Sequence, residues 1–376
     1  MKKAFSQGLL PSPDPLDNTR MKIGLSRQEK EPDLDHPSPA SRFAAIDVGS
    51  HTLRLLIATV GKRREVLPLR RDRRITRLAR DFSQTEDLSE PSMVESLAVL
   101  GEFSALLREH QVTSVICGAT GVVRRAGNAS EFLQRIEKMN GPVPSILSEE
   151  REAYLSAKGV LSGLPRKEGV VLSFDLGGSS TEFMLIDCNR ELSLWHSSVF
   201  IGAATATERF LPGDPPAASV VIRAREAVRS ALNPQLAQLQ AVLQDLHLPL
   251  SALQVVGTAG SVTTLAAMFL EMKVYDPFRI NGVLLSQTWL NRTIDLLART
   301  PLRERRQLAG LEAGREGIIL GGALVVAELL RGLKQVQFMV VDSGLLEGLL
   351  LTLIEQTFGW PERLVSPFTM DHGGEQ

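Results

Sequence analysis

The pattern of apolar and polar positions repeats in the two halves of the chain. Residues 43–57 and 172–186 each read as an apolar strand, a glycine turn and a second strand. A further apolar strand follows in each half, at 114–121 and 253–260, and each runs into a turn of small residues and then a helical pattern. Two matched copies of alternating strands and helices predict an α/β fold in which one lobe is made twice.

Helical spacing fills the segments between these strands. It predicts helices at 91–109, 130–139, 149–162, 217–246, 260–270, 286–298, 315–331 and 343–356. Lobe I then covers residues 43–162 and lobe II residues 169–357, with the glycine- and proline-containing segment 163–169 as a hinge. Ligands of such folds bind where the strand ends of the two lobes face each other, so the site is expected between the lobes.

Both chain ends lack such a pattern. Residues 1–42 are expected to form a flexible tail, because six prolines lie among charged residues and no apolar run resembles a signal peptide. Residues 358–376 are expected to form a C-terminal tail. The longest apolar stretch, at 318–330, is shorter than the roughly 18 residues of a membrane-spanning helix. We therefore expect a soluble, cytoplasmic protein with no membrane partner.

Composition narrows the class of protein. The 376 residues suit two lobes of ordinary size, and the values of 43% hydrophobic and 23% charged residues exclude a disordered or collagen-like chain. The formal net charge of −1 gives no basic footprint for DNA, so any polyanion must be held locally. The two cysteines, Cys117 and Cys188, lie in or beside apolar strands and are expected to be buried thiols.

The two glycine turns are the candidate phosphate site. Tight turns expose backbone N–H groups to a phosphate without a side chain in the way. The residues that qualify are Gly49, Ser50, Gly177, Gly178, Ser179 and Ser180. Either turn alone reads as an ordinary hairpin, but two matched turns favour phosphate binding. The aspartates Asp47 and Asp175 either stabilise the turns or hold Mg²⁺, or another divalent cation, bridged to phosphate oxygens.

Five blocks in fixed order resemble the exopolyphosphatase and guanosine pentaphosphate phosphohydrolase family of the actin-like ATPase superfamily. The likeness extends from Phe43 to Glu355. The blocks begin at Asp47, Ala119, Ser148, Asp175 and Gly257. The resemblance implies two duplicated ribonuclease H-like lobes with an interlobe cleft, in the short form without an added helical domain, and a possible homodimer.

The resemblance also implies roles for individual residues. Glu152 would be the general base for the attacking water, Arg124 would hold phosphate oxygens bidentately, and Glu182 would place the water or a metal. Gly257 and Gly260 would line the second phosphate-side turn of lobe II. From the residues alone, Ser148 to Glu152 also reads as a capped helix start, and Glu182 as a solvent-facing strand residue.

Other positions depart from the family pattern or stay open. The departures are His51, Glu149, Arg151, Ser179, Gly317 and Leu346, which lower the expectation of activity more than that of fold. Arg125 is expected to be a solvated neighbour of Arg124. The basic run 70–74 either steers a polyanion or forms a solvated edge.

Three functions are therefore open. The first is metal-dependent release of terminal phosphate from inorganic polyphosphate or guanosine pentaphosphate. The second is a catalytically weak sensor that binds polyphosphate or guanosine penta- or tetraphosphate. The third is an actin-like kinase, for which the sequence shows no sugar-binding signature.

Overall fold

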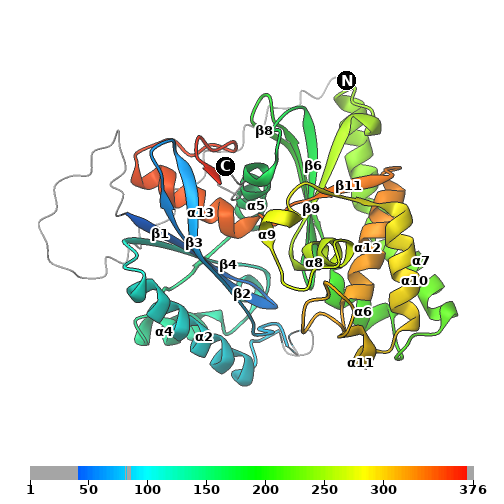
Figure 1. Ribbon diagram of the computed structural model, residues 1–376, viewed down its shortest axis with the longest axis horizontal. Coiled ribbons are helices and arrows are strands. Elements are labelled where there is room, and N and C mark those ends of the chain that lie inside the picture. The colour runs from blue at the N-terminus through cyan, green and yellow to red at the C-terminus, as the bar shows by residue number, and fades with distance from the viewer. Residues whose placement is uncertain (1–40, 81, 83–85, 371–376) are drawn as a thin grey trace, which may run out of the picture.

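The strands form two sheets of six, one in each half of the molecule (Figure 1). The computed structural model describes residues 41–80, 82 and 86–370. In spatial order the first sheet contains β12 (Thr369–Met370), β3 (Glu65–Ile75), β2 (Thr52–Val60), β1 (Arg42–Val48), β4 (Ser114–Ala119) and β5 (Ser145–Ile146). The second contains β10 (Val283–Ser286), β11 (Gln337–Val340), β9 (Leu253–Thr258), β6 (Val170–Leu176), β7 (Thr181–Asp187) and β8 (Leu192–Val199).

The two sheets share one pairing pattern. In the first, β1 pairs antiparallel with β2 and parallel with β4, while β2 pairs antiparallel with β3 and β4 parallel with β5. In the second, β6, β7, β8, β9 and β11 repeat these relations strand for strand. The predicted duplication of an α/β lobe is therefore confirmed, and each sheet carries one extra edge strand, β12 or β10.

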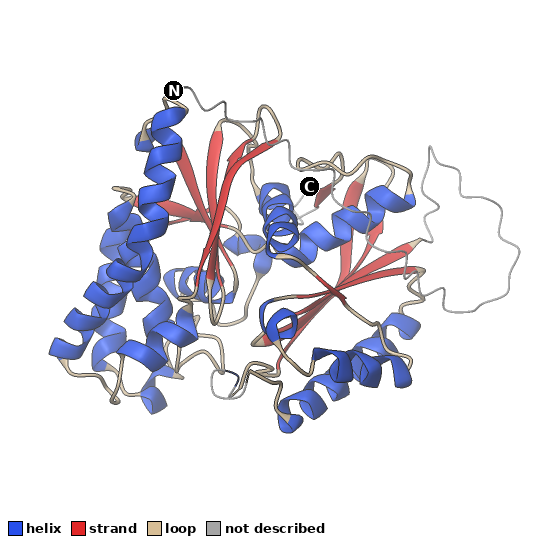
Figure 2. Cartoon of the chain, turned by 180° about the vertical axis from the view of Figure 1, so that it is seen from behind, coloured by secondary structure: helices blue, strands red, loops and turns tan. Residues whose placement is uncertain are grey.

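Helices cover the outer faces of both sheets and also lie between the two sheets, as the view from behind shows (Figure 2). They are α2 (Glu90–Glu109), α3 (Gly121–Arg125), α4 (Ala129–Lys138), α5 (Glu149–Gly163), α6 (Ala203–Phe210), α7 (Ala218–Asp245), α8 (Gly260–Phe269), α9 (Pro277–Ile280), α10 (Gln287–Arg299), α11 (Leu302–Arg305), α12 (Ile319–Gly332) and α13 (Leu345–Thr357). The helix expected at 315–331 begins only at Ile319, because Gly314 has a φ of 89° and its N–H donates to the Glu316 carboxylate.

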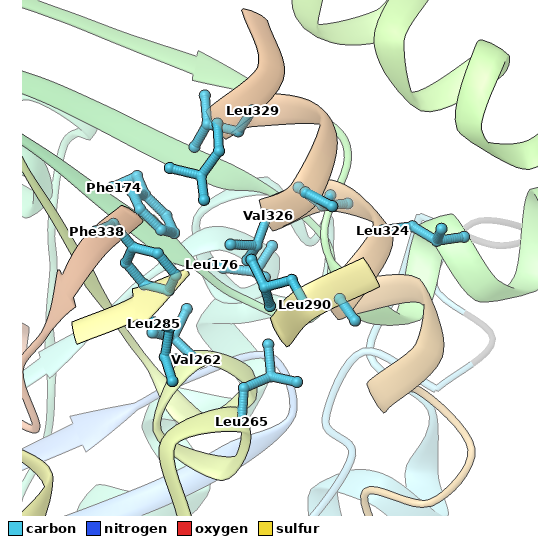
Figure 3. Packing of buried hydrophobic residues seen from close by; sticks show 14 of the residues in the cluster. Phe174, Leu176, Val262, Leu265, Leu285, Leu290, Leu324, Val326, Leu329 and Phe338 are labelled. Atoms are coloured by element: carbon cyan, nitrogen blue, oxygen red, sulfur yellow. The ribbon is translucent and has the colours of Figure 1, made fainter. Parts of the chain in front are cut away.

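The largest core lies in the second half. Phe174 and Phe338, on β6 and β11, meet with their ring centroids 5.3 Å apart, and the apolar faces of α8, α10 and α12 close over them (Figure 3). The first half has its own core, in which Phe103 of α2 and Phe132 of α4 pack against Leu53 and Leu55 of β2. Both cores follow from the apolar alternation of the strands.

Two helices are exchanged between the halves. The apolar face of α5, with Ala157 and Val160, packs against Val171 and Met184 of the second sheet. Conversely, α13 packs against the first sheet, where Leu350 joins the cluster of Phe43. Thus α5, which follows the first sheet in sequence, packs on the second sheet, and α13, which follows the second sheet, packs on the first, while the lobe boundaries at 43–162 and 169–357 stay predictions.

The chain ends also differ from expectation. Residues 358–370 do not form a loose tail, because β12 pairs with β3 and Phe368 stacks on Phe358. Residues 1–40 and 371–376, the bulk of the two expected tails, lie outside the described residues. None of the helices that the structure describes is long and apolar enough to span a membrane.

The exchanged helices α5 and α13 cross at backbone contact. A Cβ added at Gly159 would lie 1.7 Å from the carbonyl oxygen of Gly344, and one added at Gly348 would lie 1.9 Å from that of Leu155. Only glycine permits so close a crossing. Beside it, the Lys158 ammonium contacts the Glu355 carboxylate, and neither side chain has any exposed surface.

We predict that Lys158→Met lowers the free energy of unfolding by about 3–5 kcal/mol, because it leaves the Glu355 carboxylate buried without a counter-charge. The double variant Lys158→Met/Glu355→Leu should recover most of this loss. Urea denaturation monitored by circular dichroism measures both. As a control, Arg135→Met removes a pair with an exposed Glu90 and should have a much smaller effect, because solvent screens exposed pairs. Equal losses for the two single variants would contradict this account.

Candidate active site

Two aspartates end the equivalent first strands of the two sheets. Asp47 lies on β1 and Asp175 on β6, and each is followed by a glycine turn closed by the same bond. Gly49 N–H donates to the carbonyl of Thr52 over 3.1 Å, and Gly177 N–H donates to that of Ser180 over 3.0 Å. The predicted pair of matched turns is thus present in the structure.

On the neighbouring strand, the residue that faces the aspartate is positively charged in the first lobe and acidic in the second. Arg54 on β2 faces Asp47, and Glu182 on β7 faces Asp175. The Arg54 guanidinium donates twice to Asp47 Oδ2, over 2.9 Å and 2.7 Å. Although burial opposes its charge, the carboxylates of Asp47, Asp175 and Glu347 raise the pKa of Arg54 above its ordinary value. Arg54 is therefore a site residue that the sequence analysis missed.

The two turns face each other across the lobes. The site of a Cβ on Gly178 is 3.6 Å from Cβ of His51, so the turn of lobe II touches that of lobe I. Burial lowers the pKa of His51 to about 4, and the charges of Arg315, Arg77 and Arg73 act in the same direction. His51 is consequently neutral, with its buried Nε2 lacking a hydrogen-bond partner.

The other polar groups of the turns bind neighbouring backbone. Ser50 Oγ accepts a hydrogen bond from Val122 N–H at the start of α3, over 3.3 Å. The Gly178 carbonyl accepts from Ala204 N–H at the start of α6, over 2.8 Å, and that of Ser179 accepts from Thr205 Oγ1 over 3.1 Å. Each turn is therefore tied to the N-terminus of a following helix, which fixes its shape.

Glu152 and Arg124 form an ion pair. Glu152 lies in the first turn of α5, whose N-cap Ser148 accepts from Arg151 N–H. Arg124 Nη1 donates to Glu152 Oε2 and to the Leu147 carbonyl, both over 2.8 Å. Burial raises the pKa of Glu152 to about 7, which Arg124 opposes and which Asp175 and Asp47 reinforce. The start of a capped helix and a half-buried carboxylate with a raised pKa are thus compatible descriptions of the same segment.

The carboxyl groups of Glu182 and Asp175 also have raised pKa values. Burial raises the pKa of Glu182 to about 8, with Asp175 and Glu152 acting in the same direction. It raises that of Asp175 to about 6, against Arg54. Both side chains line a small cavity with Ser156 of α5 and Thr258. Glu182 is half-buried, and its Oε1 also accepts a hydrogen bond from Ser198 Oγ over 3.3 Å.

Asp47 and Asp175 are the groups that could hold a divalent cation. Asp47 Oδ1 is buried and has no hydrogen-bond partner, which leaves one carboxylate oxygen available to a cation. No cluster of three or more His, Cys, Asp or Glu with metal-ligand geometry occurs among residues 41–80, 82 and 86–370. Two carboxylates suit Mg²⁺, which completes its shell with water and substrate phosphates. The donor set therefore fits a cation that arrives with substrate.

At the end of β9 in lobe II and in the turn that follows it, Gly257 is required for packing, whereas Gly260 lies beside a charged side chain of the site. A Cβ on Gly257 would lie 2.4 Å from the Phe174 ring and 2.7 Å from that of Phe338, so ring packing accounts for this glycine. Gly260 begins α8, and a Cβ there would lie 1.8 Å from the guanidinium of Arg315. Arg315, which the sequence analysis did not select, thus occupies the space beside Gly260.

The basic run 70–74 is neither a free edge nor a free steering patch. On one face of β3, Arg71 donates to Glu347 over 2.6 Å and Arg73 contacts Glu312. On the other, Arg70 and Arg74 pair with Asp72. Strand alternation splits the run in this way.

The structure also places two of the departures from the family pattern, Leu346 and Gly317, and the residue Arg125. Leu346 is buried in the core under α13. The Cβ direction of Gly317 is open, with no atom within 4 Å. Arg125 is not simply solvated, because its guanidinium lies 4.9 Å from the ring centroid of Phe200 and 5.6 Å from that of Phe82.

Comparison with known proteins agrees with this architecture. The family model of the Ppx/GppA phosphatase family matches residues 56–357. Exopolyphosphatase 2 of Mycobacterium tuberculosis is 31% identical over 325 residues, which cover 83% of this chain and 98% of that protein.

Two solved structures show the same fold. The Ppx/GppA family member of Aquifex aeolicus superposes with a TM-score of 0.70 at 29% identity, over 84% of this chain and 98% of that one. An exopolyphosphatase of Cytophaga hutchinsonii superposes with a TM-score of 0.73 at 25% identity, over 87% and 100%. The expected actin-like fold of two ribonuclease H-like lobes is confirmed. With matched turns in its two lobes and a family match over most of its length, the chain belongs to the Ppx/GppA phosphatase family.

Proposed function

We propose that this protein is a phosphohydrolase that releases the terminal phosphate of inorganic polyphosphate, and also of guanosine pentaphosphate. The observation that carries the proposal is the position of Glu152, a half-buried carboxylate with a pKa of about 7 that is paired with Arg124 and lies near enough to Asp175 and Asp47 for their charges to raise its pKa. A group with this pKa accepts a proton readily near neutral pH. Related exopolyphosphatases supply the substrate class.

In the proposed reaction, Glu152 takes a proton from a water molecule as the water oxygen attacks the terminal phosphorus. The bond between that phosphorus and its bridging oxygen breaks, and the electron pair leaves with the shortened phosphate chain. The N–H groups of Gly49 and Gly177 close the two turns, so other backbone N–H groups of these turns, with that of Gly178 among them, bind the phosphate oxygens together with the guanidinium of Arg124. The Ser179 and Ser180 turn residues contribute to the same cradle. Glu182 orients the water from the side of lobe II.

A divalent cation, Mg²⁺ in our proposal, would be held by Asp47 and Asp175 together with substrate oxygens. When bound, it supplies positive charge to the phosphate oxygens. Arg54 already places a positive charge beside Asp47 and close to Asp175, so the two carboxylates stay ionised together at lower electrostatic cost. We also propose a cytoplasmic location, in keeping with two buried cysteines that are both free.

A sensor that binds phosphate chains with little turnover is the second candidate. It is favoured by one observation, the engagement of Glu152 by Arg124, because a base held by a guanidinium must be released before it can accept a proton. Phosphate release from purified protein decides between the two, with long polyphosphate and guanosine pentaphosphate compared side by side, with and without Mg²⁺. Ligand-dependent thermal stabilisation without phosphate release would support the sensor.

Replacing the proposed base tests the mechanism. We expect Glu152→Gln to reduce phosphate release by roughly 10²–10⁴-fold, because the amide cannot accept the proton from water. Its circular dichroism spectrum and melting temperature should remain those of a folded protein. Glu150→Gln is the matched control, since Glu150 is an exposed glutamate on the same helical turn and should keep normal turnover. Normal turnover by Glu152→Gln would remove Glu152 from the reaction.

The pH dependence tests the charge state of Glu152. The Glu152 carboxylate must be ionised to accept a proton. We therefore expect kcat/KM to be low at acidic pH and to rise with pH through a midpoint near the Glu152 pKa of about 7. Arg124→Met removes a group that lowers this pKa, so the midpoint should move to higher pH. Glu182→Gln should leave the midpoint near 7. If Glu182→Gln abolishes the pH midpoint instead, Glu182 is the base.

Metal dependence tests the two aspartates. Chelation by EDTA should stop phosphate release, and Asp175→Asn should raise the Mg²⁺ concentration for half-maximal rate by roughly tenfold. The control Asp245→Asn makes the same change at an exposed position at the end of α7 and should have no effect. Unchanged Mg²⁺ dependence in Asp175→Asn would place the cation elsewhere.

A further inference from the structure

One glutamate joins two arginines that come from different lobes. Arg73 lies on β3 of the first sheet, and Arg315 lies just before α12 of the second half. Glu312 contacts the Arg73 guanidinium through Oε1 and accepts from Arg315 Nε through Oε2, over 2.6 Å. Its two carboxylate oxygens are therefore divided between the lobes, in the way that two oxygens of a phosphate group would be.

Burial disfavours the charge of both arginines, although Tyr275 supports the charge of each and Asp342 that of Arg73. Burial lowers the pKa of Arg315 to about 10, and nearby Arg54 acts in the same direction. Burial also lowers the pKa of Arg73 to about 10, with Arg315 the next cause. The same cluster acts on His51, whose pKa is lowered by Arg315 and Arg73. Guanidiniums that repel one another in a desolvated place bind an added anion strongly.

Glu312 is placed so that it can leave. Its side chain is 27% exposed and that of Arg73 is 26% exposed, whereas that of Arg315 is only 7% exposed. It belongs to the loop between α11 and α12, which touches lobe I again at Gly314, where an added Cβ would lie 2.9 Å from Ile75. The carboxylate is thus reached from solvent, while the arginine beneath it is fixed against Gly260.

We propose that Glu312 is a specificity-determining residue that acts as an internal substitute for one anionic group of the ligand. It occupies the space between Arg73 and Arg315, and a phosphate group of the substrate enters this space only by displacing it. A ligand with a single phosphate, held at the turns, leaves Glu312 in place. A ligand with several phosphates gains the two arginines, so the protein discriminates in favour of phosphate chains. The identity of the ligand rests on the proposed function; the competition itself does not.

The sign of the effect of a substitution separates this role from a structural one. If Glu312 competes with the ligand, Glu312→Gln removes the competitor's charge, keeps its shape and strengthens binding of a phosphate chain. If Glu312 only supports the arginines, the same change weakens binding. The test uses the full chain with the Glu152→Gln change, so that the ligand is not consumed, and inorganic tripolyphosphate and orthophosphate as probes in isothermal titration calorimetry.

We expect Glu312→Gln to lower the dissociation constant for tripolyphosphate by on the order of three- to tenfold and to steepen its dependence on salt. Orthophosphate binding should change by less than about twofold, and Glu312→Asp, which keeps the charge, should bind tripolyphosphate more weakly than Glu312→Gln. Adding Arg73→Gln should remove the gain. The matched control is Glu304→Gln, which makes the same change in charge at a glutamate 52% exposed and paired with Arg303.

Unchanged or weaker tripolyphosphate binding in Glu312→Gln would overturn the proposal, and so would an equal gain in Glu304→Gln. Failure of the proposed function is seen separately. If the unsubstituted protein releases no phosphate from any substrate while Glu312→Gln still strengthens tripolyphosphate binding, the hydrolase assignment fails and the competition stands.

Discussion

The backbone contact between α5 and α13 is the constraint on which the site depends. Glycines at the crossing let the two helices approach until a carbonyl of one fills the place of a Cβ on the other. The buried pair of Lys158 and Glu355 then fixes their relative rotation and depth. Because Glu152 is in the first turn of α5 and Glu347 in the first turn of α13, this crossing positions a carboxylate from each helix between the lobes.

Duplication explains the electrostatics of the site as well as its shape. Two copies of one lobe bring two aspartates to the same region, and two such carboxylates in a buried place repel each other. The chain resolves this by using opposite charges at the position facing each aspartate, an arginine in the first lobe and a glutamate in the second. The first lobe therefore contributes a guanidinium to this region, and the second contributes carboxyl groups with raised pKa values.

The sequence predicted the elements better than their partners. Apolar alternation and glycine turns located the strands and matched turns, because both signals are local. The destinations of α5 and α13 could not be predicted, since an amphipathic pattern shows that a helix has a buried face but not which sheet covers it. Arg54 could have been predicted from the duplication, because it lies as far after Asp47 as Glu182 lies after Asp175. The contacts of Arg73 and Glu312 were not, since they join distant parts of the chain.

The exchange of helices also determines when the first lobe can be completed during synthesis. Its sheet has an apolar face, formed by residues such as Phe43 and Leu56, that packs mainly against α13, and β12 pairs with its edge strand β3. Both elements follow the second sheet in sequence. On the ribosome, where domains usually fold in order from the N-terminus, this lobe must wait with an open face and an unpaired edge until residues 345–370 have been made. The duplicated halves therefore mature as one cooperative unit, and the half made first is the one finished last.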